Sequence, residues 1–215
     1  MIPHRLLSLV GLMCLFALAG ASRASAHPHV WVSMTTELVY GADGELTALK
    51  EAWTFDEAFT AFALQGMAKT KNGTYGDDVL KPLAQTNIES LKEYDYFVYG
   101  KTASHKVAFK EPENYYLTYE NDALTLHFTL PLKKPLPAKG SLVVEVYDPS
   151  FFVSFSSAEK APVRMAGAPK GCVSTLVRPE EKAQTVPLGE AFFNNPNAAS
   201  NYGAQFADKI VVNCP

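Results

Sequence analysis

The chain has 215 residues, 47% of them hydrophobic and 19% charged, with 19 basic and 22 acidic side chains and a formal net charge of −3 at pH 7. This mildly acidic balance argues against a nucleic-acid-binding protein and against attachment to a membrane through a basic patch. The length fits one domain, which is large enough to bury a core without help from a metal or disulfides.

The first 26 residues have the organisation of a secretory signal peptide. Arg5 supplies an early positive charge, residues 6–20 are almost wholly apolar, and an Ala-Ser-Ala triplet at 24–26 forms a small-residue cleavage site. The apolar run is shorter than the about 20 residues that a membrane-spanning helix needs. We therefore expect cleavage after Ala26 and a periplasmic or equivalent extracytoplasmic location, with a retained membrane anchor as the alternative.

The mature chain, residues 27–215, is predicted to open with a β-hairpin. Residues 30–40 and 45–55 alternate loosely and are rich in strand-forming side chains, and a glycine-containing turn lies between them. Two helices are expected next, because Asp56 is a suitable N-cap and Asp77 or Asp78 can cap a second helix. Pro82 is expected in the first turn of that second helix, where a proline is tolerated.

From Tyr94 onward the pattern returns to short strands separated by turn residues. Strands are expected at 94–99, 106–110, 115–119, 124–130, 141–147, 151–155, 172–178 and 210–213. A proline-rich connection is expected at 131–140, a loop at 187–201 and a short helix at 204–209. The predicted fold class is mainly β with a helical insert near 56–93 (α+β), in one domain arranged as an antiparallel β-sandwich or open barrel.

Two cysteines remain after processing, because Cys14 leaves with the signal segment. Cys172 and Cys214 form an even pair, and an oxidising compartment favours a disulfide between them. The competing interpretation is a pair of thiols that bind a soft metal, but the wide spacing and the absence of a CxxC motif argue against it.

The best candidate for chemistry is His27-Pro28-His29. Processing would give His27 a free α-amine, and this amine and the imidazole Nδ1 can chelate one metal, while His29 adds a second imidazole on the same side of an extended chain. Three nitrogens suit Zn²⁺, Ni²⁺, Co²⁺ or Cu²⁺. Pro28 has no amide proton, which excludes the square-planar site that binds a deprotonated second amide. The alternative is that His27 is merely the first residue and His29 packs at a strand start.

Three acidic residues are candidates to complete the metal shell. Asp56 and Glu57 could supply carboxylate ligands, although helix capping also explains Asp56, and Asp148 could do the same, although a turn role is its ordinary explanation. His105, at an expected hairpin, and His127, between two threonines, are interpreted as surface residues. The sequence carries no enzyme signature such as GxSxG, HExxH or a phosphate-binding glycine loop, so we do not expect an enzyme.

Six short motifs occur in an order that resembles the domain-of-unknown-function family 1007. They are His-Pro-His-Val-Trp-Val at 27–32, Trp-Thr-Phe-Asp-Glu at 53–57, Tyr-Asp-Tyr-Phe at 94–97, Val-Tyr-Asp-Pro-Ser-Phe-Phe-Val at 146–153, Gly-Cys at 171–172 and Val-Val-Asn-Cys at 211–214. The family is often described as the periplasmic component of an uncharacterised ABC-type transport system. The resemblance implies an exported protein encoded near transition-metal permeases, notably of nickel/cobalt type.

The resemblance carries over the two histidines, the Asp56-Glu57 pair, Asp148 and the two cysteines. It departs at residues 69–78, where members often have an acidic, EF-hand-like loop and this chain has lysines. We therefore predict no Ca²⁺ site there.

These observations lead to one principal hypothesis and two alternatives. The principal hypothesis is a periplasmic accessory protein of transition-metal transport that binds a divalent ion at its processed N-terminus and works with an inner-membrane metal permease or ABC transporter component. The first alternative is a binding or scaffolding module without a metal. The second is a copper-dependent oxidative enzyme with an N-terminal histidine brace, for which His29 lies too near His27 in sequence.

Overall fold

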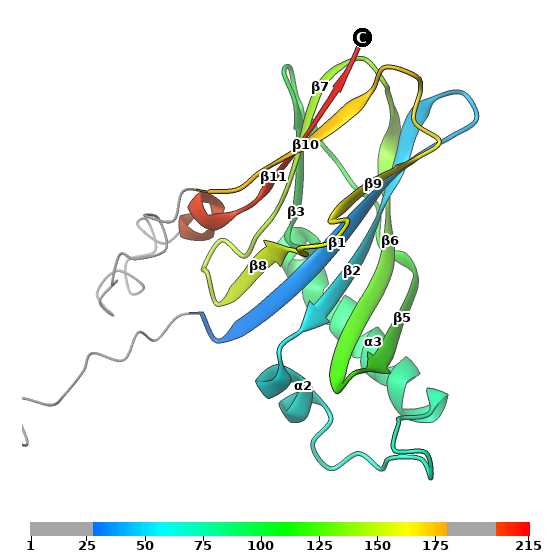
Figure 1. Ribbon diagram of the computed structural model, residues 1–215, viewed down its shortest axis with the longest axis vertical. Helices are drawn as coiled ribbons and strands as arrows, with labels where there is room; N and C mark the ends of the chain where they lie inside the picture. The colour runs from blue at the N-terminus through cyan, green and yellow to red at the C-terminus, as the bar shows by residue number, and fades with distance from the viewer. Residues whose placement is uncertain (1–27, 180–200) are drawn as a thin grey trace, which may run out of the picture.

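The computed structural model describes residues 28–179 and 201–215, and it shows two β-sheets facing each other with helices at one end (Figure 1). Sheet A contains β1 (Val30–Tyr40), β2 (Glu45–Phe55), β5 (Glu113–Glu120), β6 (Ala123–Pro137), β8 (Val153–Ser157) and β9 (Val163–Ala166). Sheet B contains β3 (Val98–Thr102), β4 (Lys106–Val107), β7 (Gly140–Val146), β10 (Val173–Val177) and β11 (Lys209–Cys214). The predicted β-sandwich with a helical insert is confirmed.

Sheet A has the order β5-β6-β2-β1-β8, and β9 also pairs with β1. The predicted opening hairpin is present, because β1 and β2 pair antiparallel from Val32↔Phe55 to Tyr40↔Leu46. The other edge of β1 pairs in parallel with β8 and then with β9. The sandwich is therefore not purely antiparallel, and β1 is bonded on both sides along most of its length.

The core lies between the sheets and is centred on Trp53. This indole is 1% exposed and meets the rings of Phe128 and Phe155 edge-on, at 4.9 and 4.8 Å between centroids. Alternate residues of the strands supply the rest of the core, as the loose alternation of the sequence predicts. Burying each large apolar side chain contributes about 1.5–3 kcal/mol.

The helical insert consists of α2 (Glu57–Ala63), α3 (Asp77–Leu91) and the 3-10 segment η1 (Lys92–Phe97), and α3 contacts β5. Two expectations about α3 are wrong. Its N-cap is Gly76 and not an aspartate, although both aspartates lie in the first turn, where the helix dipole favours negative charge. Pro82 lies inside the helix beyond the first turn. None of the helices in the described ranges has the length and apolarity that a bilayer crossing needs.

Several predicted boundaries are also wrong. Strand β4 ends at Val107 and not at residue 110, and β8 is Val153–Ser157 and not 151–155. Residues 94–97 belong to η1 and not to a strand, and Asp95, Tyr96 and Phe97 have φ of 50°, 54° and 55°. Each such left-handed residue costs about 1–2 kcal/mol, which no strand-like pattern reveals. Strand β6 continues to Pro137 through the expected connection, and the 3-10 segment η3 is Tyr202–Phe206. The loop expected at 187–201 lies almost wholly outside the described residues.

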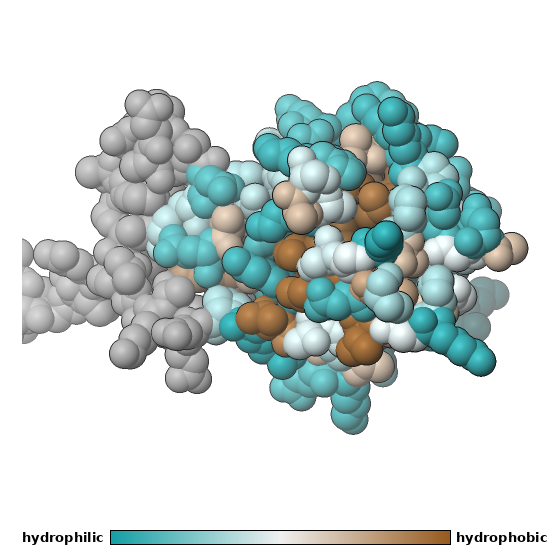
Figure 2. Space-filling view, turned by 90° about the horizontal axis from the view of Figure 1, so that it is seen from above, coloured by the Kyte–Doolittle hydropathy of each residue, from teal (hydrophilic) through white to brown (hydrophobic). Residues whose placement is uncertain are grey.

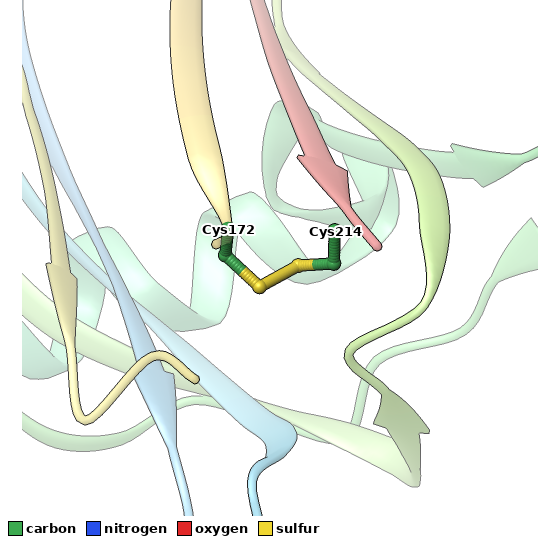
Figure 3. Close-up of a disulfide and its surroundings, with 2 residues drawn as sticks. All are labelled: Cys172 and Cys214. Carbon is green, nitrogen blue, oxygen red and sulfur yellow. A yellow bond between two sulfur atoms is a disulfide. The ribbon is translucent and has the colours of Figure 1, made fainter. Parts of the chain in front are cut away.

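A disulfide joins Cys172 to Cys214, as predicted, and it links the residue before β10 to the end of β11 (Figure 3). Figure 2 shows this end of the sandwich from above, with apolar side chains visible between polar ones. The cavity beside Cys214, lined also by Leu136, Leu142 and Val212, has a volume of about 20 Å³. It has room for little more than one water molecule.

Candidate functional site

The candidate site lies at the start of β1. His27 lies outside the described residues, and the description begins at Pro28. The backbone N–H of His29 donates to the carbonyl of Phe152 at 2.9 Å, and its exposed ring lies 4.7 Å from the ring of Phe152. The backbone of His29 is thus attached to the loop before β8, while its imidazole faces outward.

Asp148 holds that loop in place. Its side chain is 5% exposed, Oδ1 accepts from the backbone N–H and the hydroxyl of Ser150, both at 2.8 Å, and Oδ2 accepts from the backbone N–H of Val153 at 3.0 Å. Val153 is the parallel partner of Val30. The turn role considered for Asp148 is therefore confirmed, and the residue positions the loop that contacts His29.

Asp56 connects the start of β1 to the start of α2. Oδ1 accepts from the backbone N–H of Phe59 at 2.9 Å, so the predicted N-cap is confirmed. Oδ2 accepts from the backbone N–H of Trp31 at 2.7 Å, and the N–H of Asp56 donates to the Trp31 carbonyl at 2.9 Å. Glu57 follows in the first turn of α2 and is exposed.

The structure thus brings His29, Asp56 and Asp148 to the same end of β1, but with different orientations. Both oxygens of each aspartate accept backbone hydrogen bonds, which makes the two residues positioning groups for the chain that carries His29. Within residues 28–179 and 201–215, no three His, Cys, Asp or Glu side chains gather closely enough to hold a metal. The metal-ligand roles of His27, His29, Asp56, Glu57 and Asp148 therefore stay predictions.

Two aromatic residues at this site, Trp31 and Phe152, were not among the predicted site residues. Trp31, in β1, is 53% exposed. Phe152, in the loop before β8, is 47% exposed, and its ring contacts the ring of His29. Their signal in the sequence was alternation: His29, which immediately precedes β1, and Trp31, its second residue, are both exposed and lie on either side of buried Val30. An exposed tryptophan at the start of a buried strand is the observation that sequence reasoning could have used.

The two other histidines of the described residues lie elsewhere. His105 is exposed in the hairpin between β3 and β4, where its Nδ1 lies 2.9 Å from the Ser104 hydroxyl. His127 is on β6, stacked on Tyr116 with 4.5 Å between ring centroids, and Nε2 lies 3.1 Å from the Thr118 hydroxyl. Burial lowers the pKa of His127 below its usual value. Neither residue joins the site at the start of β1.

Comparison with known proteins gives similarity along nearly the whole chain. The family model described as a protein of unknown function (DUF1007) matches residues 12–214. An uncharacterised protein of Haemophilus influenzae is 25% identical over 193 residues, which cover 88% of this chain and 91% of that protein. An uncharacterised 15.5 kDa protein in the trpE 3′ region of Spirochaeta aurantia is 28% identical over 110 residues, which cover 50% of this chain and 79% of that protein.

Proposed function

The chain belongs to the DUF1007 family, and we propose that it is an exported accessory protein of transition-metal transport. It binds one divalent ion at the chain end that processing after Ala26 would create. The donors are the α-amine and imidazole of His27 and the imidazole of His29. The ion is cargo that is held for delivery, buffering or sensing, and Zn²⁺, Ni²⁺, Co²⁺ and Cu²⁺ all suit nitrogen donors.

The observation that supports this proposal is the attachment of His29. Its backbone is fixed by the 2.9 Å hydrogen bond to Phe152, and the next outward residue, Trp31, is fixed by the 2.7 Å bond to Asp56. A donor held in place before binding loses less conformational entropy when it binds. His27 lies two residues away, so its Cα is at most about 7 Å from that of His29.

Pro28 strengthens the proposal. A proline restricts φ and has no N–H, so the segment between the two histidines is stiff and offers no amide nitrogen to a metal. The ion is therefore bound by terminal and ring nitrogens, and the affinity depends on where the chain begins.

The test is a titration of protein that begins at His27 with Zn²⁺, Ni²⁺ and Cu²⁺. We expect one ion per chain, and at least about tenfold weaker binding when a glycine precedes His27 or when His29 is changed to Gln. The matched control is His105→Gln, which removes an exposed imidazole from a hairpin. Equal affinity with and without the extra glycine would remove the α-amine from the mechanism.

The exposed aromatic side chains favour a second candidate, a docking module for a membrane permease that binds no metal. Trp31 and Phe152 are both about half exposed beside His29, and aromatic residues are typical anchors of protein interfaces. The two candidates separate experimentally. Two results together would favour the docking module. The protein would bind none of the three metals, and Trp31→Gln would abolish co-purification with a permease.

A further inference from the structure

A second region of interest is an open pocket of about 770 Å³ on the outer face of sheet B, far along the chain from His29. We call it the tyrosine–lysine pocket, and the lining residues that matter here are Asp95, Tyr99, Lys101, Lys106, Lys133 and Tyr147. Its volume is in the range of small-molecule sites. Neither the predicted metal site nor the disulfide uses any of these residues.

The lysines of this pocket are arranged unfavourably for the free protein. Lys101 on β3 and Lys106 on β4 are direct cross-strand partners, and like charges in such positions destabilise a sheet. Lys101 has some compensation, because Glu145 lies 3.2 Å away, but the same carboxylate also lies 3.5 Å from Lys209. Within the described ranges, no carboxylate forms an ion pair with Lys106 or Lys133.

A second open pocket of similar volume, on the outer face of sheet A, provides a contrast. Its cations include Lys50 and Arg164, and both lie beside Glu37, at 3.4 and 3.5 Å. There two of the three cations lie beside a carboxylate of the protein, whereas Lys160, which also lines the pocket, forms no ion pair within the described residues. In the tyrosine–lysine pocket two of the three lysines form no ion pair within the described residues, so they are available to a negative charge supplied from outside.

The aromatic wall of the pocket indicates what carries that charge. The rings of Tyr99 and Tyr147 stack with 4.3 Å between centroids and 26° between planes, and such a wall favours a flat ring in the ligand. Burial, with smaller contributions from Tyr147, Asp95 and Asp148, raises the pKa of Tyr99 to about 12. Its hydroxyl therefore stays protonated at neutral pH and can donate a hydrogen bond.

One rim of the pocket has a strained backbone. Asp95 and Tyr96, which line it, belong to the three consecutive residues with φ between 50° and 55°. Such strain persists only where the surroundings enforce it and is concentrated at binding sites. The Tyr-Asp-Tyr-Phe motif at 94–97 thereby acquires a structural role as the rim of this pocket.

We infer that the tyrosine–lysine pocket binds a small organic anion, in which a carboxylate or phosphate group is attached to a flat ring. The anionic group lies between Lys106 and Lys133, and the ring lies against the stacked tyrosines. This binding is independent of the proposed metal site.

The test is calorimetric titration of the processed protein in the presence of a chelator, with benzoate and phenyl phosphate as probes. Acetate and inorganic phosphate provide the charge without the ring, and benzyl alcohol provides a ring without the charge. Benzoate and phenyl phosphate, the two full probes, carry both the ring and the charge. We expect at least one of them to bind at least about tenfold more tightly than the compound with only its charge and than benzyl alcohol. The stronger of the two identifies the anionic group.

Two lysine variants test the position of the anion. Lys133→Gln should weaken the better probe about tenfold, and the matched control is Lys134→Gln, which makes the same charge change at the neighbouring exposed residue outside the pocket. Lys106→Gln should weaken the probe and also raise the thermal midpoint of the free protein, because it removes the like-charge pair. If Lys106 had a merely structural role, its replacement would lower that midpoint.

Three results would overturn the inference. The first is no binding of either full probe at about 10 mM. The second is equal weakening by Lys133→Gln and Lys134→Gln, which would reduce the effect to general surface charge. The third is a lowered thermal midpoint for Lys106→Gln, because the unfavourable lysine pair is the observation on which the anion depends.

Discussion

Two buried carboxyl groups in this protein, Asp148 and Glu51, have opposite surroundings. Asp148 is 5% exposed and its two oxygens accept three hydrogen bonds, all from residues within five positions of it. Glu51 is 2% exposed inside the sandwich, where Oε2 accepts from the Thr36 hydroxyl at 2.8 Å and the Trp53 indole at 3.3 Å. Its Oε1 has no hydrogen-bond partner among the described residues.

The difference teaches that burial alone does not decide how a carboxyl group is accommodated. A tight loop turns backbone N–H groups toward Asp148, whereas the strands around Glu51 use their N–H groups in the ladder. Burial raises the pKa of Glu51 to about 8, although the bonds from Thr36 and Trp53 oppose the shift. Glu51 is therefore held as the neutral acid at neutral pH.

The largest effect is expected for Glu51→Gln. Folded Glu51 keeps a proton that the unfolded chain releases above about pH 4.5, so the wild-type free energy of unfolding falls as pH rises from about 4.5 to about 8 and is flat above that. The loss is on the order of 5 kcal/mol, since one pKa unit corresponds to about 1.4 kcal/mol and the pKa rises from 4.5 to about 8. Urea unfolding at a series of pH values should show that the variant lacks this loss, and parallel profiles would contradict the assignment.

Asp148→Ala should have the next largest effect. It leaves two backbone N–H groups of the loop without their acceptor, and we expect a loss of about 3 kcal/mol in urea unfolding. The matched control is Asp43→Ala in the exposed turn between β1 and β2, where one oxygen accepts from the N–H of Glu45 at 3.1 Å. That control should cost less than about 1 kcal/mol. Similar losses for both variants would mean that Asp148 is no more than an ordinary turn residue.

Asp56 extends the comparison to a carboxylate that is only partly buried. Asp56→Ala removes the N-cap of α2 and the bond to Trp31, and loss of a cap costs about 1–2 kcal/mol. Thermal unfolding provides the measurement. Asp77→Ala, at the first turn of α3 without a capping bond, should cost less than about 0.5 kcal/mol. A larger effect for Asp77 than for Asp56 would reverse our assignment of the caps.

The smallest effect is expected for Thr36→Val, which nearly conserves shape but removes one donor to Glu51. The free energy of unfolding should fall by about 1 kcal/mol. Because that hydrogen bond lowers the pKa of Glu51, its loss should also move the upper limit of the pH-dependent window above 8. If the upper limit of this pH range stays near 8, Thr36 does not stabilise the ionised carboxylate of Glu51.

The sequence predicted those parts of the fold that depend on local pattern. Strands β1 and β2 were predicted with their observed limits, and the N-cap role of Asp56 followed from its position before a helical pattern. The extension of β6 through Pro131 was missed. Beyond Thr129 this strand no longer pairs with β5, so on that side a proline without an N–H is tolerated.

The candidate site was predicted less completely, because its geometry depends on contacts between distant segments. Histidine spacing pointed to His29, but the contact with Phe152 arises only when β8 pairs in parallel with β1. Glu51 was not predicted at all, since the adjacent charged residues Lys50 and Glu51 within β2 do not indicate which of the two faces the core. The lysine pair of Lys101 and Lys106 likewise follows from strand register, which residue types alone do not determine.

The pairing of β1 has a mechanical consequence. This strand is bonded to β2 on one side and to β8 and β9 on the other, and the hydrogen bonds run across the strand. A force that pulls on Pro28 along the strand must shear both rows of bonds together and cannot peel them one at a time. A partner that pulls on the segment before β1, for example while it removes an ion from the histidines, would therefore pull against a strand that is bonded along both edges.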